Sequence, residues 1–271
     1  MAILGAVPPF TLMGIVNVTP DSFSDGGLFL DPDSAVEHGT RLAEEGADIL
    51  DVGGASTRPG AEPVPVADEL ARAVPVVERL AGAGHRVSID TTKREVAEAA
   101  LAAGATLVND VSAFRFAPEL AGVVADAGAH CCLAHMRGEP RTMQDQATYE
   151  DVVGEVRKFL EERLAYAVGE GIAEDRVSLD PGIGFGKTAD HNLELLRRLE
   201  EIVAIGRPVV IGTSRKSFLG RLLGGRAEDE RLPGTIATNV VALERGARVF
   251  RVHDVGPVAD ALSIAAATVG I

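Results

Sequence analysis

Four short polar strings contain most of the residues in this chain that could do chemistry. They are NVTPDSFSDGG at 17–27, DPGIGFG at 180–186, GTSRKS at 212–217 and RVHD at 251–254. Each string lies where an apolar, strand-like run should end. In barrels of alternating strands and helices, binding and catalytic groups gather at that edge. The four strings therefore predict one site assembled from distant segments.

Acidic and amide residues end three of the apolar runs, at Asp90, Asn109 and Asp180. Each of them taken alone favours a simple helix cap. Together they could bind the edge of a heterocycle that carries adjacent N–H and amino groups. A carboxylate accepts two parallel hydrogen bonds from such an edge, and an amide both donates and accepts. The convergence of all three favours a binding site.

Basic and hydroxyl residues follow the last two runs. Arg251 and His253 alternate along one strand face, so both can meet a phosphate, although ion pairs with Asp254 are the other interpretation. Lys216 is either a solvated surface lysine or a cation over a pocket, and the neighbouring strings favour the pocket. Ser217 begins a helical pattern, and free N–H groups at a helix start bind anions.

Two glycine-rich segments allow more than one interpretation. In GGASTRPG at 53–60, Thr57 and Arg58 belong to a donor cluster that could hold a diphosphate, or the segment is a turn before a helix. PGIGFGKT at 181–188 matches neither the P-loop nor the dinucleotide-binding pattern. It leaves a loop carrying Phe185, which is either a ring contact for a ligand or a packed side chain.

The loop that begins at Asn17 combines turn-forming residues with Phe23. Taken alone it is a turn, but at a catalytic edge it could be a mobile lid. The amide oxygen of Asn17 could join the coordination sphere of a hard cation, with substrate oxygens and water completing it.

Composition excludes several kinds of partner. The formal net charge of −14 argues against nucleic acid and anionic membranes, so an anionic substrate needs local positive charge. Adjacent Cys131 and Cys132 cannot alone form a structural disulfide or a zinc site. Packed, reduced thiols, no signal-peptide pattern and no apolar segment of about 18 residues predict a soluble, cytoplasmic protein.

Eight short apolar runs alternate with amphipathic helical patterns and must position these groups. Strands covered on both faces have this nearly continuous apolar character. The alternation predicts an α/β protein with a (β/α)8 TIM barrel and a single domain over 1–271, since the rival open doubly wound sheet usually has fewer strands. The runs are 11–18, 47–54, 86–90, 106–110, 129–136, 176–182, 207–214 and 247–254.

Taken together, the motifs resemble those of the dihydropteroate synthase family of pterin-binding enzymes. The resemblance runs from about residue 11 to residue 254 in the family's order, through NVTPDSFSDGG, GGASTRPG, SIDTTK, NDVSA, AHM with GEPRTMQ, DPGIGFGKT, GTSRKS and RVHD. It implies a transferase of folate biosynthesis and a sulfonamide target. Such an enzyme joins (7,8-dihydropterin-6-yl)methyl diphosphate to p-aminobenzoate and releases pyrophosphate. The resemblance also implies Mg²⁺ and a homodimer.

The resemblance assigns roles at the matching positions. Lys216, Arg251 and Asp90 would be catalytic, and Asn17 would help to bind Mg²⁺. Departures at Ala55, Ala134 and 112–115 remove no charged ligand. The pterin diphosphate would meet Thr57, Asp90, Asn109, Asp180, Phe185, Lys216, Arg251 and His253, and p-aminobenzoate would meet Phe23, Arg58, Pro59, Lys216 and Ser217.

The residues themselves favour a dissociative reaction. The strings supply cations for a leaving diphosphate and anions for a pterin, but no evident nucleophile. We therefore expect SN1-like loss of pyrophosphate, followed by attack of the aryl amine. Two alternatives are a methyltetrahydrofolate–corrinoid methyltransferase and a catalytically silent pterin-binding paralogue. Neither needs the full set of Asn17, Lys216, Arg251 and His253.

Overall fold

Eight parallel strands form the centre of the molecule. The computed structural model describes residues 9–19, 32–58 and 60–271. Each strand lies within one of the apolar runs, which confirms the alternation expected from the sequence. The strands are β1 (Thr11–Asn17), β2 (Ile49–Gly53), β3 (Val87–Asp90), β4 (Leu107–Asp110), β5 (His130–Ala134), β6 (Val177–Asp180), β7 (Val210–Ile211) and β8 (Val249–Val252).

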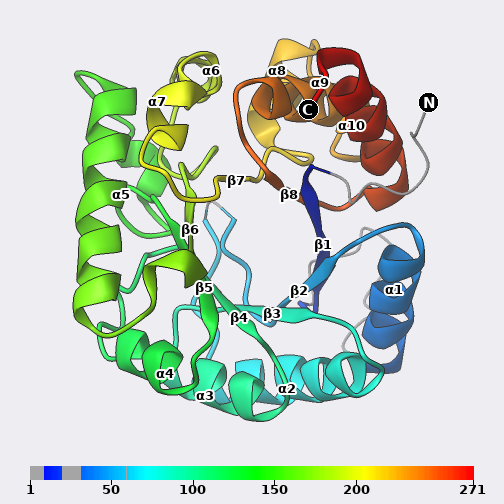
Figure 1. Ribbon diagram of the computed structural model, residues 1–271, viewed down its shortest axis with the longest axis vertical. Coiled ribbons are helices and arrows are strands. Elements are labelled where there is room, and N and C mark those ends of the chain that lie inside the picture. The colour runs from blue at the N-terminus through cyan, green and yellow to red at the C-terminus, as the bar shows by residue number, and fades with distance from the viewer. Residues whose placement is uncertain (1–8, 20–31, 59) are drawn as a thin grey trace.

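The strands close into a barrel (Figure 1). The sheet order runs β6-β5-β4-β3-β2-β1-β8-β7, with each neighbouring pair parallel. A bridge between Leu179 and Val209 joins β6 to the segment that leads into β7, and Leu179 N donates to Pro208 O at 2.9 Å. Proline has no N–H to donate, so the ladder is weak at this seam. The predicted (β/α)8 barrel is confirmed, and the open doubly wound sheet is wrong.

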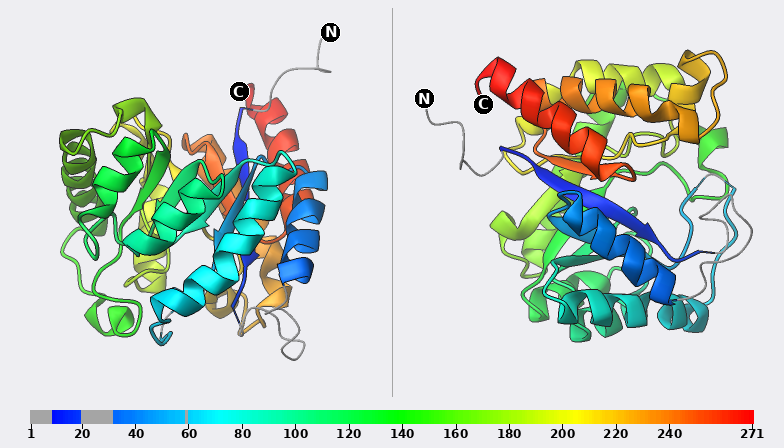
Figure 2. Two further views of the ribbon diagram at one scale, coloured as in Figure 1. Left: turned by 90° about the horizontal axis from the view of Figure 1, so that it is seen from below. Right: turned by 90° about the vertical axis from the view of Figure 1, so that its right-hand side faces the viewer.

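Helices surround the barrel on its outer face (Figure 1 and Figure 2). They cover the outward side chains of the strands, which is why the strands are apolar on both faces. The helices are α1 (Pro32–Glu44), α2 (Val66–Gly82), α3 (Arg94–Ala102), α4 (Leu120–Asp126), α5 (Val152–Gly169), α6 (Ala189–Arg197), α7 (Leu199–Val203), α8 (Ser217–Leu222), α9 (Leu232–Glu244) and α10 (Val255–Val269).

The barrel interior changes character from one layer to the next. Every second residue of a strand points inward. The lower layer is an apolar cluster of Met13, Ile49, Leu107, Cys132 and Val210. Two residues further along the same strands stand Ile15, Asp51, Asn109, Ala134 and Gly212. The apolar floor therefore gives way to polar groups near the carboxyl ends of the strands.

The two cysteines are free and buried, as expected. Cys131 packs in the core between strands and helices, whereas Cys132 belongs to the inner cluster, because adjacent strand residues face opposite ways. Burial raises the pKa of Cys131 to about 12. Within the described ranges, none of the helices is both long enough and apolar enough to cross a bilayer.

Candidate active site

A pocket of about 500 Å³ opens at the carboxyl ends of the strands. Asp180 and Lys216 both line this pocket, as expected if the polar strings of the sequence form one site. Phe23 and Pro59, also predicted for the site, lie outside the described residues. The predicted residues that line the pocket are Asn17, Thr57, Arg58, Asp90, Asn109, Asp180, Phe185, Lys216, Ser217, Arg251 and His253.

Arg251 lies between two buried carboxylates on the pocket floor. Its Nε donates to Asp51 Oδ2 at 2.6 Å, and its Nη2 donates to Asp90 Oδ2 at 2.7 Å. Asn109 Nδ2 donates to the same oxygen of Asp51 at 3.1 Å. Asp51 is fully buried and was not among the predicted site residues. Its signal in the sequence is an acid at an inward position of an otherwise apolar strand.

The pKa of Asp90 lies close to neutral pH. Burial raises its pKa to about 7, Arg251 opposes that rise, and the Asp51 charge adds to it. Among the described residues, Asp90 Oδ1 has no hydrogen-bond partner. A buried acceptor without a donor costs free energy. An N–H donor of a ligand would satisfy it.

Asp180 and Lys216 form the opposite wall of the pocket. Gly182 N donates to Asp180 Oδ1 at 2.6 Å, and burial raises the pKa of Asp180 against the lowering effect of nearby cations. Lys216 Nζ donates to Ile183 O at 2.5 Å and lies 3.9 Å from the ring centroid of Phe185. Burial lowers the pKa of Lys216 to about 8. Phe185 therefore supports a pocket cation as well as lining the wall.

His253 contributes a neutral ring. Its pKa lies well below 6.5, first because of burial and then because of Arg215. Its backbone N–H donates to Ser214 Oγ at 3.1 Å, and Ser214 Oγ lies 2.9 Å from Nδ1. A hydroxyl can both donate and accept, so Ser214 can bond either tautomer of the neutral ring. Of the two ways in which His253 could meet a phosphate, as a cation or as a neutral donor, burial leaves the neutral one.

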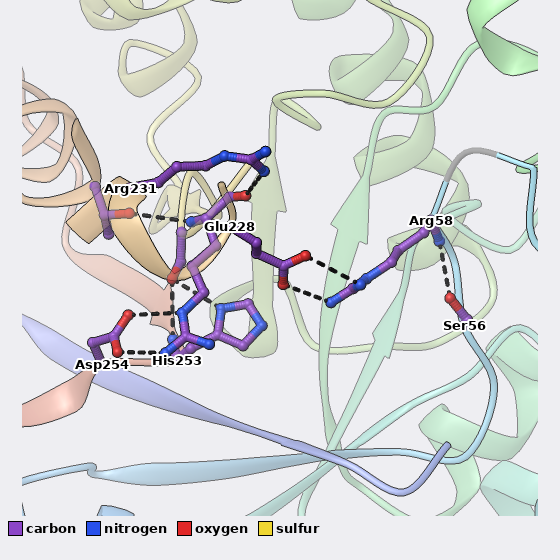
Figure 3. A network of polar contacts seen from close by, with 9 residues as sticks. Ser56, Arg58, Glu228, Arg231, His253 and Asp254 are labelled. Carbon is purple, nitrogen blue, oxygen red and sulfur yellow. Dashed lines mark hydrogen bonds and ion pairs between the residues drawn. The ribbon is translucent and has the colours of Figure 1, made fainter. Parts of the chain in front are cut away.

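A polar network surrounds the pocket mouth (Figure 3). Arg58 binds Glu228 through two hydrogen bonds of 2.9 and 3.3 Å, so it must exchange that partner to meet an anionic ligand. Asp254 binds Arg215, with bonds of 2.6 and 3.0 Å. The alternative ion pairs of Arg251 and His253 with Asp254 are therefore not formed.

The turn after β7 aims two neighbouring side chains into the pocket. Arg215 has φ of 58°, in the left-handed region that glycine favours. Thr235 Oγ1 accepts from its N–H at 3.1 Å, and Arg231 donates to its carbonyl at 2.8 Å. These bonds and the Asp254 pair hold a conformation that is unfavourable for arginine. Ser214 and Lys216 on either side of it both line the pocket.

The 112–115 segment, one of the noted departures, has a similar conformation. Ala113 and Phe114 have φ of 53° and 61°. Asp110 stabilises the turn by accepting from Ser112 N at 2.6 Å and Phe114 N at 2.9 Å. Glycine would adopt these angles without strain. Ala55 and Ala134, the other departures, line the pocket.

The residues of the pocket fit a Mg²⁺ ion that is held mainly by oxygens of a bound substrate and by water, with few protein ligands. In the described part of the chain, no group of three or more His, Cys, Asp or Glu side chains is placed to hold a metal. Asn17 presents a hard amide oxygen at the pocket wall. Mg²⁺ commonly takes one or two protein oxygens together with phosphate oxygens and water. A diphosphate in the pocket would complete such a set.

Comparisons with known proteins agree with this geometry. The family described as pterin binding enzyme matches residues 13–253. A dihydropteroate synthase of Mycobacterium leprae is 47% identical over 268 residues, which are 97% of this chain and 94% of the relative. A dihydropteroate synthase structure from Xanthomonas albilineans with 4-aminobenzoic acid superposes with a TM-score of 0.90 at 48% identity, covering 96% of this chain and 93% of that one.

A second Xanthomonas albilineans structure, in complex with 7,8-dihydropteroate, has a TM-score of 0.86 at 45% identity and covers 96% of this chain and 94% of that one. The similarity thus spans the barrel and all four polar strings. The chain belongs to the pterin-binding enzymes and, among them, to the dihydropteroate synthase family.

Proposed function

We propose that this chain condenses (7,8-dihydropterin-6-yl)methyl diphosphate with p-aminobenzoate, giving 7,8-dihydropteroate and pyrophosphate. The observation that carries the proposal is a single pocket with acceptors on Asp90, Asn109 and Asp180, and cations on Lys216 and Arg251. The first set suits a pterin, and the second suits a diphosphate. Relatives solved with 4-aminobenzoic acid and with 7,8-dihydropteroate support the same assignment.

The acidic and amide groups would hold the pterin ring. Asp90 Oδ1 is buried and unpaired in the described structure, so a ring N–H or amino group would remove an energetic penalty. Asp180 accepts from Gly182 N through Oδ1 and lines the pocket. Asn109 is oriented by its bond to Asp51. Several fixed acceptors would thus orient the ring before the reaction begins.

The diphosphate would lie near Thr57, Arg251 and the ring of His253. Mg²⁺ bound with Asn17 would neutralise charge that develops on the leaving pyrophosphate. Arg251 is held by two carboxylates, so its position does not depend on the ligand. Preorganised charge of this kind lowers the barrier because nothing needs to reorient in the transition state.

The bond between the methylene carbon and the diphosphate oxygen would break first, with both electrons leaving on oxygen. The pterin delocalises the positive charge on the carbon, and the carboxylates near the ring stabilise it. The aryl amine then forms the new C–N bond and releases one proton. Strictly concerted displacement, with no cationic character at the carbon, would contradict this part of the proposal.

The second substrate would enter between the loops at the pocket mouth. Ser217 and Arg58 line the pocket there, and Arg58 would leave Glu228 for the carboxylate. By the family resemblance, Phe23 and Pro59, which lie outside the described residues, would also belong to the aminobenzoate site. From the family we further infer a homodimer, and the two unpaired, buried cysteines favour a reducing compartment such as the cytoplasm.

One assay tests the function. The chain is incubated with the dihydropterin diphosphate, p-aminobenzoate and Mg²⁺, and both pyrophosphate and dihydropteroate are measured. We expect release that depends on the amine. Release without the amine would indicate a hydrolase, and no release would favour a silent pterin-binding protein. The methyltransferase alternative is not favoured, because it needs no diphosphate-binding groups.

A further inference from the structure

Lys187 is a buried lysine for which the proposed mechanism has no role. Burial lowers its pKa well below 10.5, and the charge of Asp180 opposes that fall. Lys187 directly follows the glycine-rich loop 182–186 and is only 3% exposed. Its Nζ lies 2.9 Å from Gly182 O, 3.1 Å from Phe185 O and 2.8 Å from His135 Nδ1. Burial and the lysine charge hold the pKa of His135 well below 6.5, so this ring is neutral. Two carbonyls and an imidazole nitrogen match the three donors of an ammonium group.

The same loop also contacts Lys216. The carbonyl of Ile183 accepts from Lys216 Nζ, and the ring of Phe185 lies beneath that ammonium. The loop 182–186 is thus held by two lysines, Lys187 and Lys216, and both of them line the pocket. Any shift of the loop moves the groups that place Lys216 over the pocket.

The backbone leaves this loop little freedom to compensate. Gly182 has φ of +67°, and a Cβ built there would lie 1.8 Å from His135 O. Asn192 Oδ1 accepts from Gly184 N at 2.7 Å. Tyr149 donates its hydroxyl to Gly186 O at 3.0 Å. The loop is therefore fixed from several sides, and Lys187 holds its two ends together through Gly182 and Phe185.

The charge of Lys187 also acts on Asp180. Burial raises the pKa of Asp180, and Lys216, Lys187 and Arg251 lower it. These cations approach from the start of α8, from the loop after β6 and from β8. On β5, the neighbouring Cys132 is a thiol whose own pKa is raised by burial and by Asp180, so it carries no charge.

We propose that Lys187 is a positioning residue of the active site: its side-chain nitrogen fixes the loop 182–186 so that Lys216 is held over the pocket, and its protonated form favours the ionised form of Asp180. The inference rests on the proposed function only where activity is measured. Its electrostatic part concerns the unliganded protein and is tested separately.

The backbone amide of Gly182 gives a direct readout. It donates to Asp180 Oδ1 at 2.6 Å, so its proton chemical shift follows the ionisation of that carboxyl. We compare wild type with Lys187→Gln, which keeps donors without charge, and Lys187→Met, which keeps only the shape. The expected result is a rise of about one pH unit in the Gly182 midpoint in both variants, because a nearby opposite charge has been removed.

A matched control is Arg163→Gln. Arg163 is another partly buried cation that fixes a loop, through a 2.7 Å bond to Ala113 O, but it has no contact with Asp180. Its loss should lower thermal stability and leave the Gly182 midpoint unchanged. If Lys187→Met does not fold, Lys187→Gln carries the test alone, with circular dichroism confirming its fold.

Kinetics test the positioning part. In pyrophosphate release with both substrates, kcat/KM for the dihydropterin diphosphate should fall at least about tenfold in Lys187→Met. A folded variant with an unmoved Gly182 midpoint would overturn the proposal, and so would wild-type kcat/KM. A wild-type protein that releases no pyrophosphate would refute the proposed function instead, while the Gly182 titration would still decide the role of Lys187.

Discussion

Asp51→Asn is the sharpest test of how the pocket floor is built. The change keeps the size of the side chain and removes its charge. Asp51 Oδ2 accepts from Arg251 at 2.6 Å and from Asn109 at 3.1 Å, whereas Oδ1 has no partner among the residues described. The amide oxygen can still accept from Arg251, so the fold of the floor should persist. The variant therefore tests the effect of the Asp51 charge alone.

The size of the effect follows from these contacts. A hydrogen bond to a charged group contributes about 1.5–3 kcal/mol, and a neutral replacement contributes about 1 kcal/mol. The loss of roughly 1 kcal/mol in the positioning of Arg251 should lower kcat/KM about fivefold. The free energy of unfolding should change by less than about 1 kcal/mol, because the buried guanidinium keeps Asp90 as its partner.

The pH dependence of activity tests the direction in which the Asp51 charge shifts the pKa of Asp90. Asp90 has a pKa of about 7, and the Asp51 charge contributes to that rise. The ionised carboxylate binds the pterin, so activity should fall as the pH drops through about 7. Without the Asp51 charge the pKa of Asp90 falls, and the acid limb of kcat/KM moves to lower pH.

Pyrophosphate release measured from about pH 5 to about pH 9 shows both limbs of the profile. The control is Asp48→Asn, near the start of the same strand, where Asp48 Oδ2 accepts from Leu12 N at 2.7 Å far from the pocket. It should alter stability without moving the profile. An acid limb that stays in place or moves to higher pH in Asp51→Asn would refute the reasoning.

Three further outcomes are expected. Lys216 is charged below its pKa of about 8, so kcat/KM should fall as the pH rises through about 8. Lys216→Ala should lose about 2 kcal/mol of transition-state stabilisation, and its kcat/KM should no longer show this fall at alkaline pH. Wild-type turnover in this variant would contradict the role of Lys216. Gly182→Ala should lower the melting temperature measured by calorimetry by several degrees, because its Cβ would lie 1.8 Å from His135 O, and an unchanged melting temperature would contradict the close approach of these two segments. Chelation of Mg²⁺ should stop pyrophosphate release, and Asn17→Ala should raise the Mg²⁺ concentration needed for half-maximal activity about tenfold, whereas an unchanged requirement would contradict the role of Asn17.

Much of the site was predictable because the strand pattern and the site pattern coincide. Asp90, Asn109 and Asp180 each end an apolar run, and parallel strands bring such ends to one edge. The residue types then indicate acceptors at one part of the pocket and cations at another. This reasoning needs only the order of the runs, and it placed these residues around one cavity.

Other parts of the site could not be predicted in this way. Asp51 lies inside an apolar run and Lys187 lies beyond the end of one, so neither is at a strand end, and their roles depend on the partners that packing brings to them. Arg251 meets Asp51 and Asp90, which are 200 and 161 residues away in the chain. Several pairings with nearby acids were equally open in the sequence, and Asp254 was taken by Arg215 instead.

Local periodicity and chain order were enough to establish the alternation of strands and helices, the edge at which chemistry would occur, and the kinds of groups that gather there. Which of those groups carry a charge became clear only from the way the chain packs. Burial leaves His253 neutral and brings Asp90 and Lys216 close to their titration points, and burial is a property of everything packed around a side chain rather than of its own position in the chain.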